Sequence, residues 1–468
     1  MNKQVLVNYF DHQAQHRDLW RKRNWYYHRA IQNLCRFVIP EGSSVLEVGS
    51  STGELLNALK PKYGVGVDIS PTMVAIAQSK YSQFKWYMGD VEDLSLVDSF
   101  DYVVMSDVIG FLDDIEQVFL SLRGVCHERT RLVITYHNYL WEPLLQLAEF
   151  LHLKAKQPLQ NWLSKQDIEN MLYLAGFEVI KKGNKMICPV WIPIVSHVVN
   201  KIISNSPLFS RLGLIQYFVA RPQSKVTKDY SVSIVIPARN EKGNIENAVM
   251  SLPNFGSKQE IIFVEGHSID GTWEEIQRIK LKYGNRKNIC SVIQKGKGKG
   301  DAVRLGFQIA QGEILMILDA DLTVLPKDLP KFYRALASGS GEFINGSRLV
   351  YPLGEESMFF FNIIGNKFFS AMFSWILGQR IKDTLCGTKV LFKNDYEKIA
   401  AGRKYFGDFD PFGDFDLLFG AAKLNLKIVE MPIRYRARTY GSTNIQRWKH
   451  GWLLFKMTLF AMRKMKFN

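Results

Sequence analysis

The stretch GEILMILDADLTV, residues 312–324, places two carboxylates, Asp319 and Asp321, directly after an apolar run. Burying an unpaired carboxylate inside a sheet is costly, so we expect the pair at the exposed tip of a strand. Side chains at positions i and i+2 of an extended chain point to the same side, so both carboxylates could bind one divalent cation. A polar loop that closes a buried strand explains the same pattern, and the rest of the chain has to decide between the two interpretations.

The composition is that of a folded protein with an excess of positive charge. The 468 residues are 47% hydrophobic and 22% charged, and the formal net charge is +15. This length predicts two or three domains, and the charge indicates anionic partners such as nucleotides, nucleic acid or acidic lipid. The segment 431–468 has nine Lys or Arg residues and no acid, so it carries more than half of the excess.

The cysteines and the apolar segments predict a cytoplasmic protein at a membrane surface. Five scattered cysteines without a CxxC spacing favour reduced thiols. The N-terminus lacks the apolar core of a secretory signal, and no segment has the roughly 20 uninterrupted apolar residues of a spanning helix. Segments 358–378 and 451–462 suit helices that lie in a bilayer interface, although helices packed on the protein's own core explain them equally well.

A polar, proline-containing seam at residues 220–230 divides the chain into two α/β halves. Each half alternates short apolar, strand-like runs with helical stretches, which predicts two doubly wound, Rossmann-like domains with ligands at the carboxyl ends of their strands. We assign residues 1–222 to the first domain, 223–230 to a linker, and 231–468 to a second domain that ends in a basic amphipathic tail.

The first half contains a series of acids at successive strand ends. VLEVGSSTGELL (45–56) runs from a strand through a glycine-bearing turn into a helix, which lets a ligand approach the backbone. VGVDIS (65–70) ends on Asp68, which suits the ribose hydroxyls of a nucleoside, and MGDVED follows with Asp90. SFDYVVMSDVIGFL (99–112) supplies a fourth strand.

This series resembles class I S-adenosylmethionine-dependent methyltransferases over roughly residues 40–182. The residues that the resemblance assigns to the cofactor S-adenosylmethionine are Glu47, Gly49, Gly53, Asp68 and Asp90. It implies that the first three shape the methionine side of the pocket, that Asp68 holds the ribose, and that Asp90 meets the adenine amino group. The alternatives are a nicotinamide-binding Rossmann domain and an inactive relative of the family.

Three further features of the first half bear on methyl transfer. Ser51 stands where the family usually has glycine, which implies a crowded cofactor site. His137 follows the next strand and is our candidate base, although a hydrogen-bonded structural histidine is the alternative. The basic, aromatic stretch 17–29 suits either a substrate lid or a solvated helix face, and the apolar segment 185–222 suits a docking surface for a lipid or for the second half.

The second half has four motifs in a fixed order. SIVIPARNEKGNI (233–245), FVEGHSIDGT (263–272), QKGKGKGDAVRLGF (294–307) and the Asp319–Asp321 pair resemble family 2 inverting glycosyltransferases of the GT-A fold, especially those that act on polyprenyl phosphates. The resemblance implies that Asp319 and Asp321 bind Mg²⁺ or Mn²⁺ on the diphosphate of a nucleotide sugar. It assigns the nucleotide sugar to Pro237, Glu241, Glu265, Asp270 and Lys299.

The last third of the chain supplies candidate acceptor residues. Arg348, Arg436 and Arg438 could bind an acceptor phosphate through paired hydrogen bonds. An anionic acceptor needs no general base, whereas a hydroxyl acceptor does. Asp414 and Asp416 are the candidate bases, with pairing to a neighbouring arginine as the structural alternative.

The sequence therefore predicts a bifunctional transferase at the cytoplasmic face of a membrane. One half transfers a sugar to a polyprenyl phosphate or glycan, and the other transfers a methyl group. The first alternative keeps the glycosyltransferase and makes the N-terminal half a binding or docking module without catalysis. A nucleic-acid-binding protein is disfavoured, because no recognition module with interleaved base-stacking aromatics is evident.

Overall fold

The computed structural model describes residues 3–94, 96–224, 227–348, 360–405, 413–434, 438, 440 and 447–466. Side chains are not described at residues 360–366, 404, 414, 447–451 and 454. Arg436 lies outside the described residues, as does the side chain of Asp414. The chain divides into two compact units, with the division between Gln223 and Ser224.

The first unit is built on a seven-stranded sheet with the order β3-β2-β1-β4-β5-β7-β6. Its strands are β1 Ser44–Val48, β2 Tyr63–Asp68, β3 Lys85–Met88, β4 Phe100–Ser106, β5 Cys126–His137, β6 Phe177–Lys185 and β7 Ile215–Pro222. Its helices are α1 Lys3–Ala14, α2 Arg17–Arg23, α3 Trp25–Val38, α4 Glu54–Leu59, α5 Pro71–Lys80, α6 Ile115–Leu122, α7 Glu142–Phe150, α8 Lys165–Leu174 and α9 Val195–Val198. Strands β1 to β5 are parallel, and β7 runs antiparallel to both β5 and β6.

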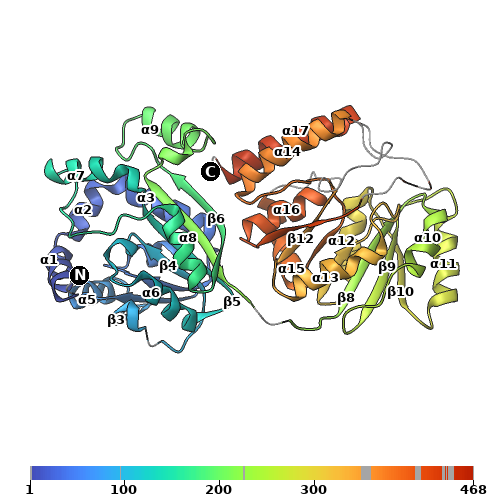
Figure 1. The fold of residues 1–468 in the computed structure, drawn as a ribbon, viewed down its shortest axis with the longest axis horizontal. Coiled ribbons are helices and arrows are strands. Elements are labelled where there is room, and N and C mark those ends of the chain that lie inside the picture. Colours follow the sequence, from blue (N-terminus) through green and yellow to red (C-terminus); the bar gives the residue numbers. More distant parts are fainter. Residues whose placement is uncertain are drawn as a thin grey trace. The chain divides into compact units, whose positions relative to one another are not determined.

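Alternate residues of the central strands pack into two separate cores. Leu46 and Val48 of β1 belong to one core with α6 and α8, whereas Val45 belongs to the other with α3 and α4. Successive side chains of a strand point to opposite faces, so the sheet is covered on both sides (Figure 1). This covering leaves the carboxyl ends of the strands as the place for a ligand.

The second unit repeats this design with the strand order β10-β9-β8-β11-β13-β12-β14. Its strands are β8 Val232–Ala238, β9 Gln259–Glu265, β10 Asn288–Ile293, β11 Ile314–Ile317, β12 Phe343–Ser347, β13 Lys389–Phe392 and β14 Ile428–Pro432. Its helices are α10 Lys242–Met250, α11 Thr272–Tyr283, α12 Lys299–Ile309, α13 Leu329–Ala337, α14 Phe360–Leu377, α15 Lys393–Ala401, α16 Asp414–Lys423 and α17 Arg447–Met465. Only β13 runs antiparallel to its neighbours among these described strands. Two seven-stranded, mainly parallel sheets confirm the predicted fold class.

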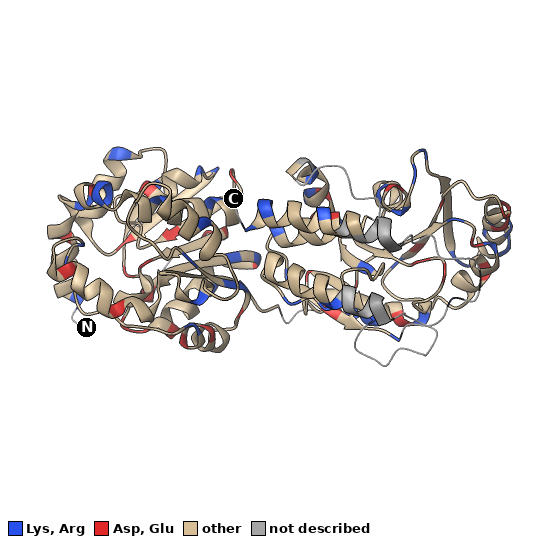
Figure 2. Cartoon of the chain, turned by 90° about the horizontal axis from the view of Figure 1, so that it is seen from above, with Lys and Arg blue, Asp and Glu red and all other residues tan. Residues whose placement is uncertain are grey.

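The two apolar segments singled out in the sequence correspond to α14 and α17, which pack against each other (Figure 1). Phe373 of α14 and Ala461 of α17 are buried, whereas Trp452 and Phe455 of α17 are exposed. Helix α17 therefore has both buried and exposed apolar side chains. Among the described residues, we find no helix that combines the length and the apolarity needed to cross a membrane. Charged residues of both signs lie mainly on the helices and loops outside the sheets (Figure 2).

Candidate functional site

The first unit contains a cavity of about 360 Å³ at the carboxyl ends of its parallel strands. Of the cofactor and catalytic residues predicted there, Glu47, Gly49, Asp68, Asp90 and His137 line this cavity. Gly53 lies just outside the lining, at the start of α4, with φ of +85°. A Cβ at position 53 would come within 2.5 Å of the Trp86 ring, so the close packing there requires glycine.

The turn after β1 is held by hydrogen bonds to Asp68. The carboxylate of Asp68 accepts from the backbone N–H groups of Ser51, at 2.7 Å, and Ser70, at 2.9 Å. Burial raises the pKa of Asp68, although both of these hydrogen bonds favour its ionised form. Ser51 adopts a left-handed backbone with φ of +49°, a conformation that glycine takes at lower cost. The serine is thus accommodated at this position with local strain.

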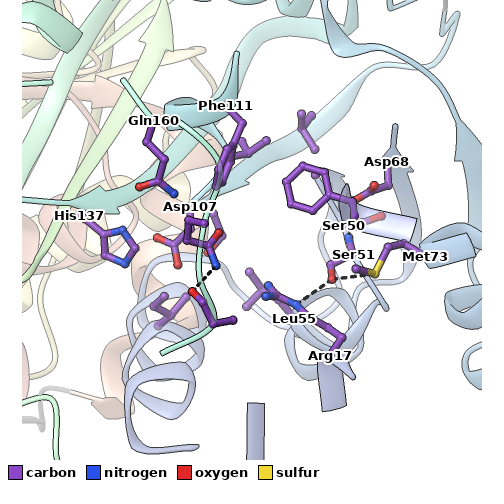
Figure 3. Close-up of a pocket in the computed structure, with 18 of the residues that line it drawn as sticks. Arg17, Ser50, Ser51, Leu55, Asp68, Met73, Asp107, Phe111, His137 and Gln160 are labelled. Atoms are coloured by element: carbon purple, nitrogen blue, oxygen red, sulfur yellow. Dashed lines mark hydrogen bonds between the residues drawn. The ribbon is translucent and has the colours of Figure 1, made fainter. Parts of the chain in front are cut away.

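Arg17 of α2 reaches the same turn from the N-terminal helices. Its Nε donates to Oγ of Ser51 at 3.2 Å, and its side chain lines the cavity. Burial lowers the pKa of Arg17. In Figure 3, Arg17 lies between the side that carries Asp68 and Met73 and the side that carries Asp107 and His137. The stretch 17–29 therefore contributes to the cavity lining rather than only to a solvated helix face.

The opposite side of the cavity contains a hydrogen-bonded chain of Tyr27, Asp107 and His137. The Tyr27 hydroxyl donates to Oδ2 of Asp107 at 2.8 Å and lies 3.0 Å from Nε2 of His137. Because the single hydroxyl proton serves Asp107, Nε2–H of His137 donates to the tyrosine oxygen. Burial lowers the pKa of His137, with Asp107 acting in the opposite direction. In this neutral tautomer, Nδ1 of His137 is the ring nitrogen that could accept a proton as a general base.

In the second unit, Asp319 and Asp321 lie at the tip of the fully buried strand β11. Nζ of Lys299, the first residue of α12, lies 2.5 Å from Oδ1 of Asp319. Burial alone would raise the pKa of Asp319, but Lys299 and the more distant Lys389 and Arg348 hold it below its usual value. A Cβ on Gly387 would lie 2.1 Å from Oδ2 of Asp319, so glycine is required where this turn approaches the ion pair.

Arg438 joins two of the predicted acids. Its Nη2 lies 2.7 Å from Oδ2 of Asp321, and its Nη1 lies 3.4 Å from Oε1 of Glu241. Oδ1 of Asp321 accepts from the N–H and the hydroxyl of Thr323. Burial raises the pKa of Glu241, although Asn244 and Arg438 favour its ionised form. Arg438 therefore lies among the residues predicted for the nucleotide sugar and the metal, and not apart from them.

The donor set at this tip fits a divalent cation bound together with a diphosphate. Mg²⁺ is usually held by one or two carboxylates, substrate phosphates and water. Asp319 and Asp321 supply two such carboxylates, and each of them pairs with a side-chain cation in the structure. Within the described part of the chain, no cluster of three or more His, Cys, Asp or Glu residues could hold a metal by itself. A bound nucleotide and water molecules would supply the remaining ligands.

Two predicted nucleotide-site acids mainly order loops. Glu265, at the end of β9, accepts from the backbone N–H groups of His267 and Ser268. Asp270 accepts from the N–H of Lys242, the N–H and hydroxyl of Thr272, and the hydroxyl of Tyr440. Burial would raise the pKa of Asp270, but these hydrogen bonds lower it. Both acids fix loops at the same edge of the sheet.

Two further candidates, Arg348 and Asp416, are held in ion pairs. Asp383 is fully buried and accepts two hydrogen bonds from the Arg348 guanidinium, at 2.7 and 2.8 Å. Asp416 pairs with Arg403 at 2.7 Å and with Arg304 at 3.5 Å. This is the structural pairing that the sequence left open for Asp416. Pro237 lies in β8 opposite Val264 of β9.

Family models match each unit. Residues 19–182 match the model of a methyltransferase domain, and residues 233–395 match glycosyl transferase family 2. The chain carries a methyltransferase domain followed by a family 2 glycosyltransferase domain. This assignment confirms the resemblances stated from the sequence.

Curated relatives match about half of the chain. A dolichol-phosphate mannosyltransferase of Pyrococcus furiosus is 30% identical over 245 residues, which are 51% of this chain and 64% of that protein. The chain thus spans less than two thirds of that relative's length. The glycosyltransferase AglJ of Haloferax volcanii is 26% identical over 227 residues, which are 48% of this chain and 70% of that protein.

Solved structures resemble the chain more distantly. A Thermotoga maritima S-adenosylmethionine-dependent methyltransferase, described as a possible histamine N-methyltransferase, is 17% identical, with a TM-score of 0.37 over 46% of this chain and 98% of its own. The magnesium protoporphyrin IX methyltransferase of Synechocystis, with bound S-adenosylhomocysteine, is 18% identical, with a TM-score of 0.35 over 47% and 100%.

Three cavity residues of the methyltransferase domain were not predicted from the sequence. Arg17 and Tyr27 belong to the basic, aromatic stretch that suggested a lid, and Asp107 directly follows strand β4. Strand β4 pairs with β5, the strand that ends on His137. An acid directly after β4 was therefore a sign in the sequence of a residue close to His137. The φ of +56° at Asp107 was not visible in the sequence, and a strained backbone of this kind is often found at functional sites.

Glu47 should make the stability of the methyltransferase domain depend on pH. Burial raises its pKa from 4.5 to about 8. Between these values the folded state binds more protons than the unfolded state, so stability is greatest below pH 4.5 and is lost as the pH rises to about 8. Glu47→Gln should remove this slope, which is up to about 1.4 kcal/mol per pH unit. Urea denaturation at several pH values measures it, and an unchanged slope would contradict the assignment.

Arg438 should compete with a metal ion for Asp321. We expect Arg438→Gln to strengthen the binding of Mn²⁺ alone several-fold, because it removes the positive charge paired with that carboxylate. Electron paramagnetic resonance titration of free Mn²⁺ measures this. Arg278→Gln, which removes an exposed arginine paired with Glu246 and Glu275, is the matched control. Equal or weaker binding in the Arg438 variant would contradict the competition.

Proposed function

We propose that the glycosyltransferase domain transfers a sugar from a nucleotide sugar to a polyprenyl phosphate or glycan, with inversion at the anomeric carbon. The observation that carries this proposal is the Asp319–Asp321 pair at the tip of β11 with Lys299 and Arg438 beside it. When bound, Mg²⁺ or Mn²⁺ would neutralise charge on the departing diphosphate. Asp319 and Asp321 would hold the ion.

The cations of the site suit the charge that develops on the leaving group. The acceptor oxygen forms a bond to the anomeric carbon as the bond from that carbon to the diphosphate breaks. Lys299 and Arg438 pair with the two aspartates, and with a metal held by those carboxylates they would be available to donate to diphosphate oxygens. A phosphate acceptor arrives ionised, so a base such as Asp414 or Asp416 is required only for a hydroxyl acceptor. Arg348, Arg436 and Arg438 remain the proposed contacts for an acceptor phosphate.

We propose that the methyltransferase domain binds S-adenosylmethionine with Asp68 at the ribose and Asp90 near the adenine. When bound, the cofactor supplies an electrophilic methyl group on a sulfonium. Asp68 and Met73 lie on one side of the cavity and His137 on the other (Figure 3). The acceptor nucleophile would lie between them, and His137 would accept its proton.

We further propose that the protein is peripheral on the cytoplasmic face of a membrane. Helix α17 buries Met457 and Ala461 and exposes Trp452, Phe455 and Leu459. Basic residues share this helix, which suits the anionic headgroups of a bilayer. Polyprenyl acceptors reside in such membranes, and their use would place the enzyme in the synthesis of a cell-envelope glycan.

Removal of both metal-binding carboxylates should abolish sugar transfer. Purified protein is incubated with membranes, Mg²⁺ and a panel of nucleotide sugars, and release of nucleoside diphosphate is recorded. We expect release from one or a few donors and at least a 100-fold decrease in the double variant Asp319→Asn, Asp321→Asn. Asp328→Asn, at an acid paired with Lys331 outside the site, is the control. Full activity of the double variant would refute the role of the metal.

Asp68 should determine cofactor affinity. We expect calorimetric titration of the full chain with S-adenosylmethionine to give saturable heat, and Asp68→Ala to weaken binding at least tenfold through loss of the ribose contacts. Asp98→Ala, which removes an exposed acid bonded to Tyr63, should bind normally. The absence of heat with the unaltered protein would instead support a non-catalytic docking module.

A further inference from the structure

The methyltransferase domain exposes a large apolar surface formed by residues 139–159 and 190–212, here called the apolar face. Nearly half of the exposed large apolar side chains of the described chain lie in these two segments. Phe150 is 78% exposed, Ile194 79% and Leu208 75%. Exposed apolar patches of this extent mark a surface that binds a partner or a membrane.

The two segments of the apolar face are held together by specific contacts. Nε1 of Trp141 donates to the carbonyl oxygen of Leu212 at 2.8 Å, and Nδ2 of Asn138 donates to the carbonyl oxygens of Arg211 and Gly213. The second segment is fixed to α3, since the ring centroids of Trp191 and Tyr26 lie 5.2 Å apart. These contacts therefore hold in place the segments that carry the exposed apolar side chains.

The apolar face continues into the cofactor cavity. Leu153, from the first segment, and Val190, from the second, are more than half exposed and also line the cavity. The lining of this cavity also includes the polar side chains of Tyr27, Asp107 and His137. A ligand that extends from the face into the cavity would thus pass from apolar to polar surroundings.

The charges of the face favour an anionic partner. Residues 190–212 include Lys201 and Arg211 and no acid, and residues 139–159 contain two lysines and two glutamates. Ile194, Val198 and Ile202 follow one another at intervals of four along α9 and the π-helical segment Val199–Ile203, and all three are exposed. An apolar helical surface with aromatic residues and unbalanced basic charge suits the interface of an anionic bilayer.

We propose that the apolar face docks the methyltransferase domain on an anionic membrane, so that a membrane-embedded amphiphile enters the cavity from the bilayer as the methyl acceptor. Its apolar part would remain on the face, and its polar part would reach Tyr27 and His137. Helix α17, proposed above to contact a membrane, belongs to the other unit. The identity of the acceptor rests on the proposed methyl transfer, whereas membrane docking does not.

Hydrogen–deuterium exchange of the full chain tests docking, with and without vesicles of phosphatidylcholine and phosphatidylglycerol. We expect vesicles to slow exchange in both segments of the face. The triple variant Phe150→Glu, Ile202→Glu, Leu208→Glu should lose this protection and partition at least tenfold less onto vesicles. A control triple variant, Val97→Glu, Tyr173→Glu, Leu174→Glu, adds the same charge at exposed positions of the same unit and should behave as the unaltered protein.

Two outcomes would overturn membrane docking. One is protection by vesicles confined to residues 447–466, which would assign membrane contact to α17 alone. The other is slow exchange of both segments before vesicles are added, which would mean that the second unit or another copy of the chain covers the face. Retained calorimetric binding of S-adenosylmethionine shows that the face variant is folded.

Transfer of radioactive methyl groups from S-adenosylmethionine to membranes tests the acceptor class. We expect label in the organic-solvent extract, reduced at least tenfold in the face variant. Label only in the aqueous or protein fraction would overturn an amphiphilic acceptor. Absence of label from every fraction would contradict methyl transfer itself, and the exchange experiment would still decide the docking surface.

Discussion

Both sites depend on the groups that offset the negative charge of a carboxylate at the end of a buried strand. Strands β2 and β11, which lead to Asp68 and Asp319, are almost fully buried, so an acid at their tip keeps its charge only if donors surround it. Asp68 is compensated by two backbone N–H groups, that of Ser51 in the loop after β1 and that of Ser70 in the loop after β2. Asp319 is compensated by Lys299 at the start of α12. Backbone donors favour a fixed loop, whereas a side-chain cation can be exchanged for a metal ion.

The sequence was sufficient for the parallel core because its signals are local. Apolar runs that end on Asp68 or Asp319 give both the strand and its ligand-binding end. The antiparallel strands were harder to recognise. Segment 185–222 reads as one apolar stretch, yet its end forms β7 inside the sheet while residues 190–212 remain partly exposed. Composition alone does not separate a strand buried on both faces from an apolar surface.

The partners of the predicted acids could not be found from the sequence, because they lie far away along the chain. Tyr27 and His137 are 110 residues apart, and Asp321 and Arg438 are 117 residues apart. Strand periodicity places an acid at an edge but does not identify which distant helix or loop brings the opposite charge. Arg438 is an example. Its guanidinium group suggested a contact with an acceptor phosphate, whereas the structure places it beside Asp321.

The bridge from Arg438 to Asp321 and Glu241 can prepare the site without blocking it. Asp321 remains partly accessible, whereas Glu241 is buried, and Arg438 pairs with both. A divalent cation held by the Asp321 carboxylate would interact more strongly, because it carries twice the charge. The arginine displaced in this way would be available to donate to the diphosphate oxygens directly. The same guanidinium would thus stabilise the carboxylates before the donor binds and the diphosphate afterwards.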